Sequence, residues 1–178
     1  MSKSEQGDRR LLFWGIYYLD VFSALQLGVP RLLKDHEIEC ALPISENGHP
    51  GVSLADQVIR LEGQVSEFSL SLLRFSKILG NILDSIFKRG MTSSIAQQVA
   101  LIHENALDSW RRGLPKNLTF ELDVNGTINM EELNSGSHWK KDYSTAPSCD
   151  NRTLMVLYFL VKCLVHLPVL AAKPLLGG

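Results

Sequence analysis

The chain has 178 residues, of which 45% are hydrophobic and 21% charged, and its formal net charge at pH 7 is -1. This length and composition are typical of one globular domain with a sizeable core. Without a basic cluster the chain is poorly suited to bind nucleic acid directly, because phosphate contacts need clustered lysine and arginine. Three widely spaced cysteines, none in a CxxC pair, indicate neither a disulfide framework nor a zinc site. The polar first ten residues lack the apolar run of a secretory signal, so we expect an intracellular protein.

Residues 9–27 predict a helix that opens with a basic pair and then becomes densely apolar. A helix that is apolar nearly all round is enclosed by other elements. We therefore expect the remaining helices to pack around this one. Gly28 provides a left-handed C-cap and Pro30 prevents continuation, so the helix must end there.

Residues 53–88 predict a second, long helix, because apolar side chains recur every three or four residues from Leu54 to Ile86. Ser53 and Asp56 resemble a capping box at its start. The apolar stripe is wider than the two positions per heptad of a coiled-coil dimer. The pattern thus favours burial within one domain over a dimer seam.

Residues 95–112 predict a third helix, preceded by a second capping box at Ser94 and Gln97. Gly113 and Pro115 end this helix. The side chains expected on its buried face are Ile95, Val99, Ile102, Ala106 and Trp110.

A polar interval at residues 116–151 lacks helical periodicity, and we expect it to be exposed and flexible. Within it, residues 121–133 resemble a calcium loop of the EF-hand kind, although the two helices that should flank such a loop are missing. A last apolar helix is expected over residues 152–165. Its surroundings are barely long enough to cross a membrane, and Lys162 in the middle favours a buried helix instead.

These elements predict an all-α fold, an irregular helical domain of about four main helices. We expect residues 1–178 to be a single, fragment-like part of a larger helical domain. The sequence contains no phosphate-binding loop, no GxSxG elbow and no catalytic Cys-His signature. We therefore expect no enzymatic activity.

Three segments carry a gapped pattern of residues in a fixed order. The first contains Arg9, Arg10, Phe13, Trp14, Tyr17, Asp20, Ser23, Gly28, Pro30, Asp35 and Pro43, the second Trp110, Leu114 and Pro115, and the third Tyr158, His166 and Pro168. This pattern resembles the central regulatory region, or middle homology region, of fungal binuclear zinc-cluster transcription factors. The resemblance implies that these residues are mainly structural.

The resemblance also implies a nuclear regulatory domain that controls transcription through a small effector, other transcription-regulatory proteins or the rest of its own chain. DNA binding and zinc would belong to a six-cysteine domain outside this sequence. We thus expect no cofactor in this segment, no direct nucleic-acid contact and no membrane contact. A stand-alone helical interaction module is the alternative, followed by a calcium-binding loop protein.

Asp20 is the most unusual single residue, since a carboxylate in an apolar helix must be paired or hydrogen-bonded. The simpler explanation is structural, either an ion pair with an arginine such as Arg31 or a cap for a neighbouring helix. The alternative is that Asp20 contacts an effector.

Overall fold

The computed structural model describes residues 3–45, 64–87, 92–120, 122 and 149–171. Its elements in chain order are α1 (Lys3–Leu27), the 3-10 helix η1 (Asp35–Glu37), β1 (Ile44–Ser45), β2 (Gln64–Val65), α3 (Glu67–Ile86), α4 (Ser93–Arg112), α6 (Cys149–Val165) and α7 (Leu167–Ala171). The two short strands pair in parallel. All other described elements are helical, which confirms the predicted all-α class. The prediction that residues 1–178 form a single domain stays a prediction.

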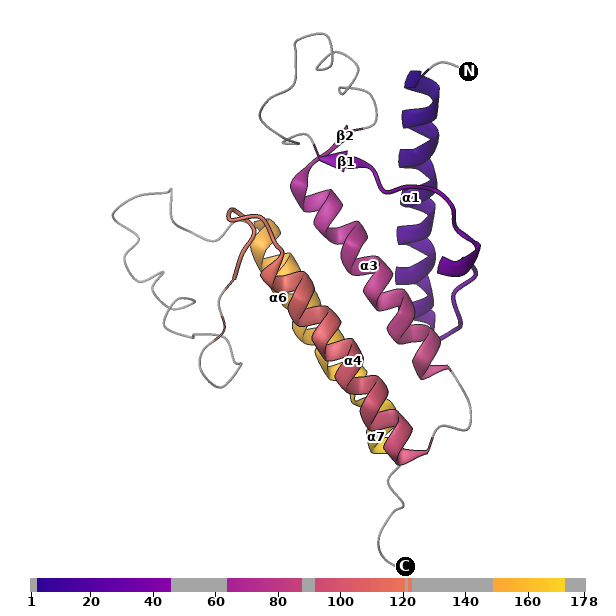
Figure 1. The fold of residues 1–178 in the computed structure, drawn as a ribbon, viewed down its shortest axis with the longest axis vertical. Coiled ribbons are helices and arrows are strands. Elements are labelled where there is room, and N and C mark those ends of the chain that lie inside the picture. Colours follow the sequence, from indigo (N-terminus) through magenta and orange to yellow (C-terminus); the bar gives the residue numbers. More distant parts are fainter. Residues whose placement is uncertain (1–2, 46–63, 88–91, 121, 123–148, 172–178) are drawn as a thin grey trace, which may run out of the picture.

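The central element is α3, which packs against α1 on one side and against α4 and α6 on the other (Figure 1). The expectation that the other helices surround the first one was therefore wrong. The inner face of α1 is buried through Trp14 and Tyr17, whereas Leu12, Ile16 and Leu19 on its outer face are 66%, 50% and 62% exposed. Sequence periodicity identified α1 as apolar on both faces, but only one of these faces meets another described element.

The two ends of α1 differ in how well the sequence predicted them. Gly28 has a φ of +65° just after the helix, and the Val29 amide donates to the Ala24 carbonyl at 3.2 Å. This left-handed cap confirms the predicted end. The helix begins earlier than expected, at Lys3, and a Glu5–Arg9 ion pair of 3.0 Å lies along its first turns.

The second helix is shorter than predicted, because residues 64–65 form β2 and Ser66 caps α3. The Ser66 hydroxyl accepts the Ser69 amide at 3.1 Å, so the local hydrogen bonds fix the start at Glu67. The predicted start at Ser53 lies outside the described residues. Within α3, the predicted apolar seam is buried at Phe75, Leu79 and Ile82 and half-buried at Phe68, Leu72 and Ile86.

The third helix begins at Ser93, where the Thr92 hydroxyl caps it by accepting the Ile95 amide at 3.4 Å. The predicted capping box is thus displaced by two residues. The buried side chains of α4 are Ala96, Ala100, Leu107 and Trp110. The predicted Ile95 and Ile102 are exposed, because the face is rotated by one residue and places small alanines at the helix contacts.

The last helix, α6, includes the predicted residues 152–165 and starts three residues earlier, within the interval expected to be flexible. A turn at His166 separates it from α7, where Pro168 fits the first helical turn. The remainder of the polar interval is described only at residues 116–120 and 122. Apart from Leu122, the calcium-loop candidate at 121–133 lies outside the described residues.

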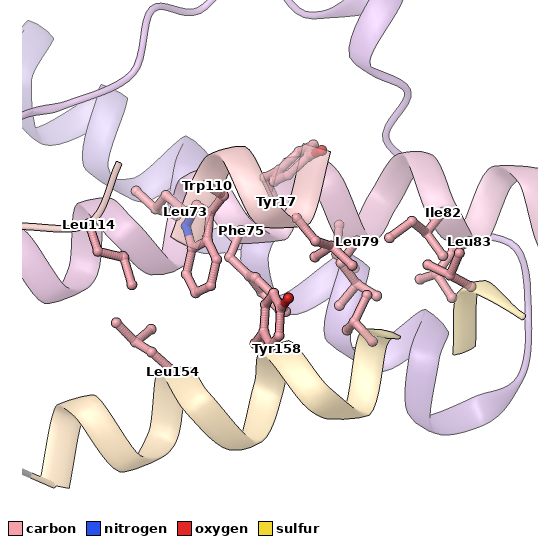
Figure 2. Close-up of a cluster of buried hydrophobic side chains, with 14 of the residues drawn as sticks. Tyr17, Leu73, Phe75, Leu79, Ile82, Leu83, Trp110, Leu114, Leu154 and Tyr158 are labelled. Atoms are coloured by element: carbon pink, nitrogen blue, oxygen red, sulfur yellow. The ribbon is translucent and has the colours of Figure 1, made fainter. Parts of the chain in front are cut away.

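The core forms where α3, α4 and α6 meet, and Figure 2 shows Phe75, Trp110 and Tyr158 converging there. The rings of Phe75 and Trp110 have centroids 4.9 Å apart, and the indole N–H of Trp110 donates to the Ser71 carbonyl at 2.9 Å. Trp14 is anchored in the same way, by donating to the Ala41 carbonyl at 2.8 Å. Both indoles therefore combine buried area with a satisfied donor.

Candidate functional site

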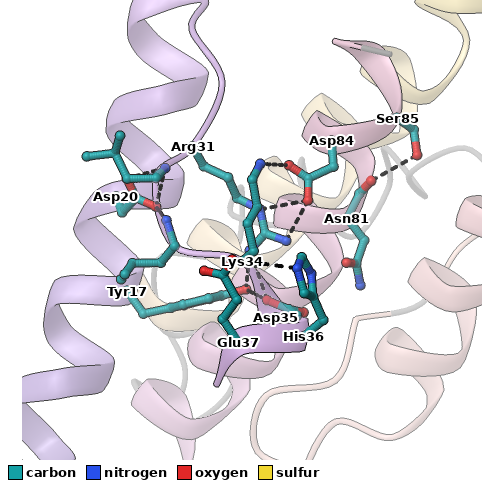
Figure 3. Close-up of polar contacts among 12 residues, drawn as sticks. Tyr17, Asp20, Arg31, Lys34, Asp35, His36, Glu37, Asn81, Asp84 and Ser85 are labelled. Carbon is teal, nitrogen blue, oxygen red and sulfur yellow. Dashed lines mark hydrogen bonds and ion pairs between the residues drawn. The ribbon is translucent and has the colours of Figure 1, made fainter. Parts of the chain in front are cut away.

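The most extensive polar site consists of Tyr17, Arg31, Lys34, Asp35 and Asp84, which we name the Arg31 cluster (Figure 3). Its central guanidinium is only 1% exposed. Nε and Nη2 donate to Asp84 Oδ2 at 3.2 and 2.8 Å, while Nη1 donates to Asp35 Oδ1 and the Tyr17 hydroxyl, both at 2.9 Å. Lys34 Nζ donates to Asp84 Oδ1 at 2.7 Å. The cluster thus joins α1, the segment after it and α3.

Gly80 explains how a buried arginine fits between the two helices. A Cβ at this position would lie 2.8 Å from Arg31 Nη1 and 3.1 Å from the Tyr17 hydroxyl oxygen. Glycine inside a helix costs about 1 kcal/mol relative to alanine. In α3 this cost is offset by the space that Gly80 leaves for the guanidinium.

The charges of the Arg31 cluster are balanced, with two cations and two carboxylates. Burial, together with the hydrogen bond to Asp35, raises the pKa of Tyr17 above its ordinary value, so its hydroxyl stays protonated and donates to Asp35 at 2.6 Å. Burial alone would raise the pKa of Asp84, but hydrogen bonds from Arg31 and Lys34 outweigh it and lower this pKa. A balanced, hydrogen-bonded group of this kind is suited to holding helices together rather than to binding a charged ligand.

Asp20 lies beside this cluster but does not pair with Arg31, so the suggested ion pair was wrong. Its two carboxylate oxygens each accept the Leu32 amide at 3.0 Å, and one also accepts the Leu33 amide at 2.9 Å. Asp20 therefore has a structural role, but it holds the irregular segment after Pro30 and does not cap a neighbouring helix as suggested. The effector contact stays a prediction.

A second polar group lies across α4 and the C-terminal helices. The Tyr158 hydroxyl donates to Asp108, and burial together with this bond raises the pKa of Tyr158 to about 12. His166 Nε2 lies 3.1 Å from Glu104 Oε1. These contacts tie two of the family-pattern residues to α4, away from the Arg31 cluster.

The remaining pattern residues are distributed along the fold and do not converge on one site. Arg9 and Ser23 are exposed, Pro43 and Leu114 are buried, and Phe13, Pro115 and Pro168 are half-buried. Arg10 is half-buried as well, whereas Pro30 is exposed.

Sequence reasoning missed Asp84, Lys34 and Asp108 as site residues. The one local signal was Asp84, a carboxylate four residues after Gly80 within the apolar helix.

A cavity of about 330 Å³ opens between α3 and α4, and sequence reasoning did not anticipate it. Its lining comprises Ser71, Arg74, Ile78, Ala106, Ser109, Trp110, Gly113 and Leu114. This volume is at the lower end of the range typical of small-molecule sites.

The described residues offer no metal site, and one stretch of them has the length and composition of a membrane span. Within the described ranges, no group of three or more His, Cys, Asp or Glu side chains could hold a metal ion. In the same part of the chain, one stretch, Cys149–Leu170, is long and apolar enough to cross a membrane by length and composition alone. Four of its side chains, Leu154, Tyr158, Val161 and Val165, are buried in this structure.

Residues 1–112 match the model of the fungal specific transcription factor domain. Since the match covers more than half of the chain, the protein belongs to this family, and it is a regulatory domain of a fungal transcription factor. The predicted resemblance is confirmed.

Two curated relatives support this assignment. The chain is 51% identical over 193 aligned residues to regulatory protein CAT8 of Saccharomyces cerevisiae, covering 98% of this chain and 13% of that protein. It is 29% identical over 169 residues to transcriptional activator protein acu-15 of Neurospora crassa, covering 93% of this chain and 16% of that protein. The chain spans less than a fifth of the length of each relative. No solved structure matches the chain.

Proposed function

We propose that this domain controls the output of a nuclear transcription factor through contacts between an exposed apolar helix face and other protein. DNA binding and its zinc would lie in a separate domain, and this segment would carry no cofactor. Family membership supports the regulatory role, and the two relatives are named as a regulatory protein and a transcriptional activator protein. The observation that carries the proposal is the outer face of α1.

The outer face of α1, which we define as Leu12, Ile16 and Leu19, forms a stripe with four-three spacing on the side away from α3. Fully burying a large apolar side chain contributes about 1.5–3 kcal/mol. Covering the three half-exposed side chains of this face would thus favour association by a few kcal/mol, and the lost entropy of the two partners opposes this gain. Such contiguous exposed apolar surface typically marks an interaction site.

The occupant we propose is an amphipathic helix, because a narrow stripe at this spacing fits side-by-side packing with one other helix. It would come from the rest of the regulator's own polypeptide or from a transcription-regulatory partner. The relatives extend far beyond the aligned region, which leaves ample protein in a regulator of this kind to supply such a helix.

A reporter assay tests the proposal. The chain is fused to an unrelated DNA-binding domain, and reporter output is compared with that of the DNA-binding domain alone. The test variant carries Leu12→Gln, Ile16→Gln and Leu19→Gln. The matched control carries Ile95→Gln, Leu101→Gln and Ile102→Gln, three apolar side chains of similar exposure on α4.

We expect the fused domain to change reporter output, the α1 variant to abolish the change and the α4 variant to retain it. Circular dichroism of both variants checks that the helices are kept. An unchanged reporter with the intact domain, or equal behaviour of the two triple variants, would contradict the proposal.

A further inference from the structure

The cavity between α3 and α4 is built from two antiparallel helices of a hairpin. α3 contributes Ser71, Arg74 and Ile78 from one face, and α4 with the residues after it contributes the opposite wall. The small side chain of Ala106 and the cap at Gly113 leave the space open where longer side chains would fill it.

The two side-chain hydroxyls in the lining, Ser71 and Ser109, have no hydrogen-bond partner among the described residues. Ser71 is 2% exposed, yet its hydroxyl makes no hydrogen bond, whereas the hydroxyls of Ser76 and Ser85 donate to carbonyls four residues earlier at 2.8 and 2.9 Å. The Ser71 hydroxyl opens onto the cavity, so a molecule that enters the cavity can form a hydrogen bond with it. Ser109 adds a second hydroxyl to the lining.

Arg74 is the one charged side chain in the lining, and it forms no ion pair with the described part of the chain. This distinguishes it from Arg31, whose charge is fully used within its cluster. An unpaired guanidinium beside two hydroxyls favours a carboxylate, which it can bind through two parallel hydrogen bonds.

The wall opposite Arg74 is apolar and rigid. The Trp110 indole is fixed by its bond to the Ser71 carbonyl and by contact with Phe75. Leu114 extends this wall, and Ile78 adds apolar surface on the α3 side, one turn after Arg74. A preformed aromatic wall favours a planar or compact apolar body, because little ordering is needed on binding.

From this arrangement, we propose that the α3–α4 cavity binds a small organic carboxylate, with its acid group at Arg74 and the Ser71 hydroxyl and its apolar body against Trp110. The site would give the regulatory domain a chemical input. The inference thus rests on the proposed function for its biological meaning, but its binding test does not depend on any transcriptional effect.

The test uses the ¹⁵N-labelled 178-residue chain and follows the Trp110 indole N–H signal by NMR. Phenylacetate is the probe, and phenylacetamide is its neutral counterpart of nearly the same shape. Arg74→Gln removes the cation at an exposed position, and Arg152→Gln, an exposed arginine of α6 outside the cavity, is the matched control. Ala106→Leu fills the cavity without changing its charge.

We expect phenylacetate to shift the Trp110 signal saturably, with an affinity at least about tenfold higher than that of phenylacetamide, a difference of about 1.4 kcal/mol. Arg74→Gln should remove this preference, Ala106→Leu should weaken both probes, and Arg152→Gln should change neither. The absence of a saturable shift in the unmodified chain would overturn the proposal. Equal binding of the acid and the amide, or loss of binding in Arg152→Gln, would do the same. Since the readout is binding alone, failure here would leave the reporter result unaffected.

Discussion

Replacement of Gly80 by alanine has two opposing effects on stability: it raises helix propensity, and it crowds the side chains of the Arg31 cluster. Alanine in place of a helical glycine would stabilise α3 by about 1 kcal/mol if nothing else changed. Its methyl group, however, would lie 2.8 Å from Arg31 Nη1, and the buried guanidinium would have to move. That movement disrupts the bonds from Nη1 to Tyr17 and Asp35.

Hydrogen bonds to charged groups contribute about 1.5–3 kcal/mol each, and water cannot replace them around a side chain that is 1% exposed. Taking the lower figure for two bonds and deducting the propensity gain, we expect Gly80→Ala to lower the free energy of unfolding by about 2 kcal/mol. Urea unfolding followed by circular dichroism measures this change.

Asn81→Ala is the matched control, since the exposed neighbour gains helix propensity without facing the cluster. We expect it to stabilise the domain by a few tenths of a kcal/mol. In an Arg31→Met background the contact with Nη1 is gone and only the Tyr17 hydroxyl oxygen, 3.1 Å away, remains close, so Gly80→Ala should cost less there. If Gly80→Ala stabilises the otherwise unmodified chain, the described packing of the Arg31 cluster is refuted.

Three further predictions concern the other polar groups. Asp20→Asn should destabilise the domain by about 1–2 kcal/mol in urea unfolding, because one side-chain oxygen of the amide remains for the two backbone donors. The same variant should leave phenylacetate binding unchanged, and loss of that binding would favour an effector contact at Asp20. Tyr158→Phe should cost about 1–2 kcal/mol by removing the bond to Asp108, and a change below the error of the measurement would contradict the described contact. The pKa of Asp84 is lower in the folded chain than in the unfolded chain, so the unfolded chain binds the proton first as the pH falls. The stability that the Asp84 carboxylate contributes is therefore complete above the usual pKa of 3.8 and is lost as the pH falls through the lower folded value. Asp84→Asn should flatten this acid loss in pH-dependent unfolding, whereas an unchanged profile would show that Asp84 is not stabilised by Arg31 and Lys34.

The sequence predicted where the helices lie along the chain better than it predicted how they pack against one another. Glycine and proline act locally, which is why the end of α1 at Gly28 and the end of α4 at Arg112 could be predicted. Periodicity identifies apolar faces, but it does not say which of them another helix covers. This is why α1 was expected at the centre, and why the buried face of α4 was displaced by one residue.

The candidate site was predictable only in part, for a similar reason. The need of Asp20 for a partner follows from its position in an apolar helix, but the identity of that partner depends on how the chain turns after Pro30. Arg31 and Asp84 are 53 residues apart in sequence and meet only through the packing of α1 on α3. The α3–α4 cavity likewise arises from two helix faces that no local pattern relates.

If the outer face of α1 is a protein contact surface, its side chains should be shielded from solvent in the whole regulator. Hydroxyl-radical footprinting with mass spectrometry measures side-chain accessibility directly, so it can compare the isolated chain with the same sequence in the regulator purified from cells. We expect Leu12, Ile16 and Leu19 to be oxidised readily in the isolated chain and to be protected in the purified regulator, while Leu101 on α4 changes little. Equal oxidation of the α1 residues in both preparations would contradict it.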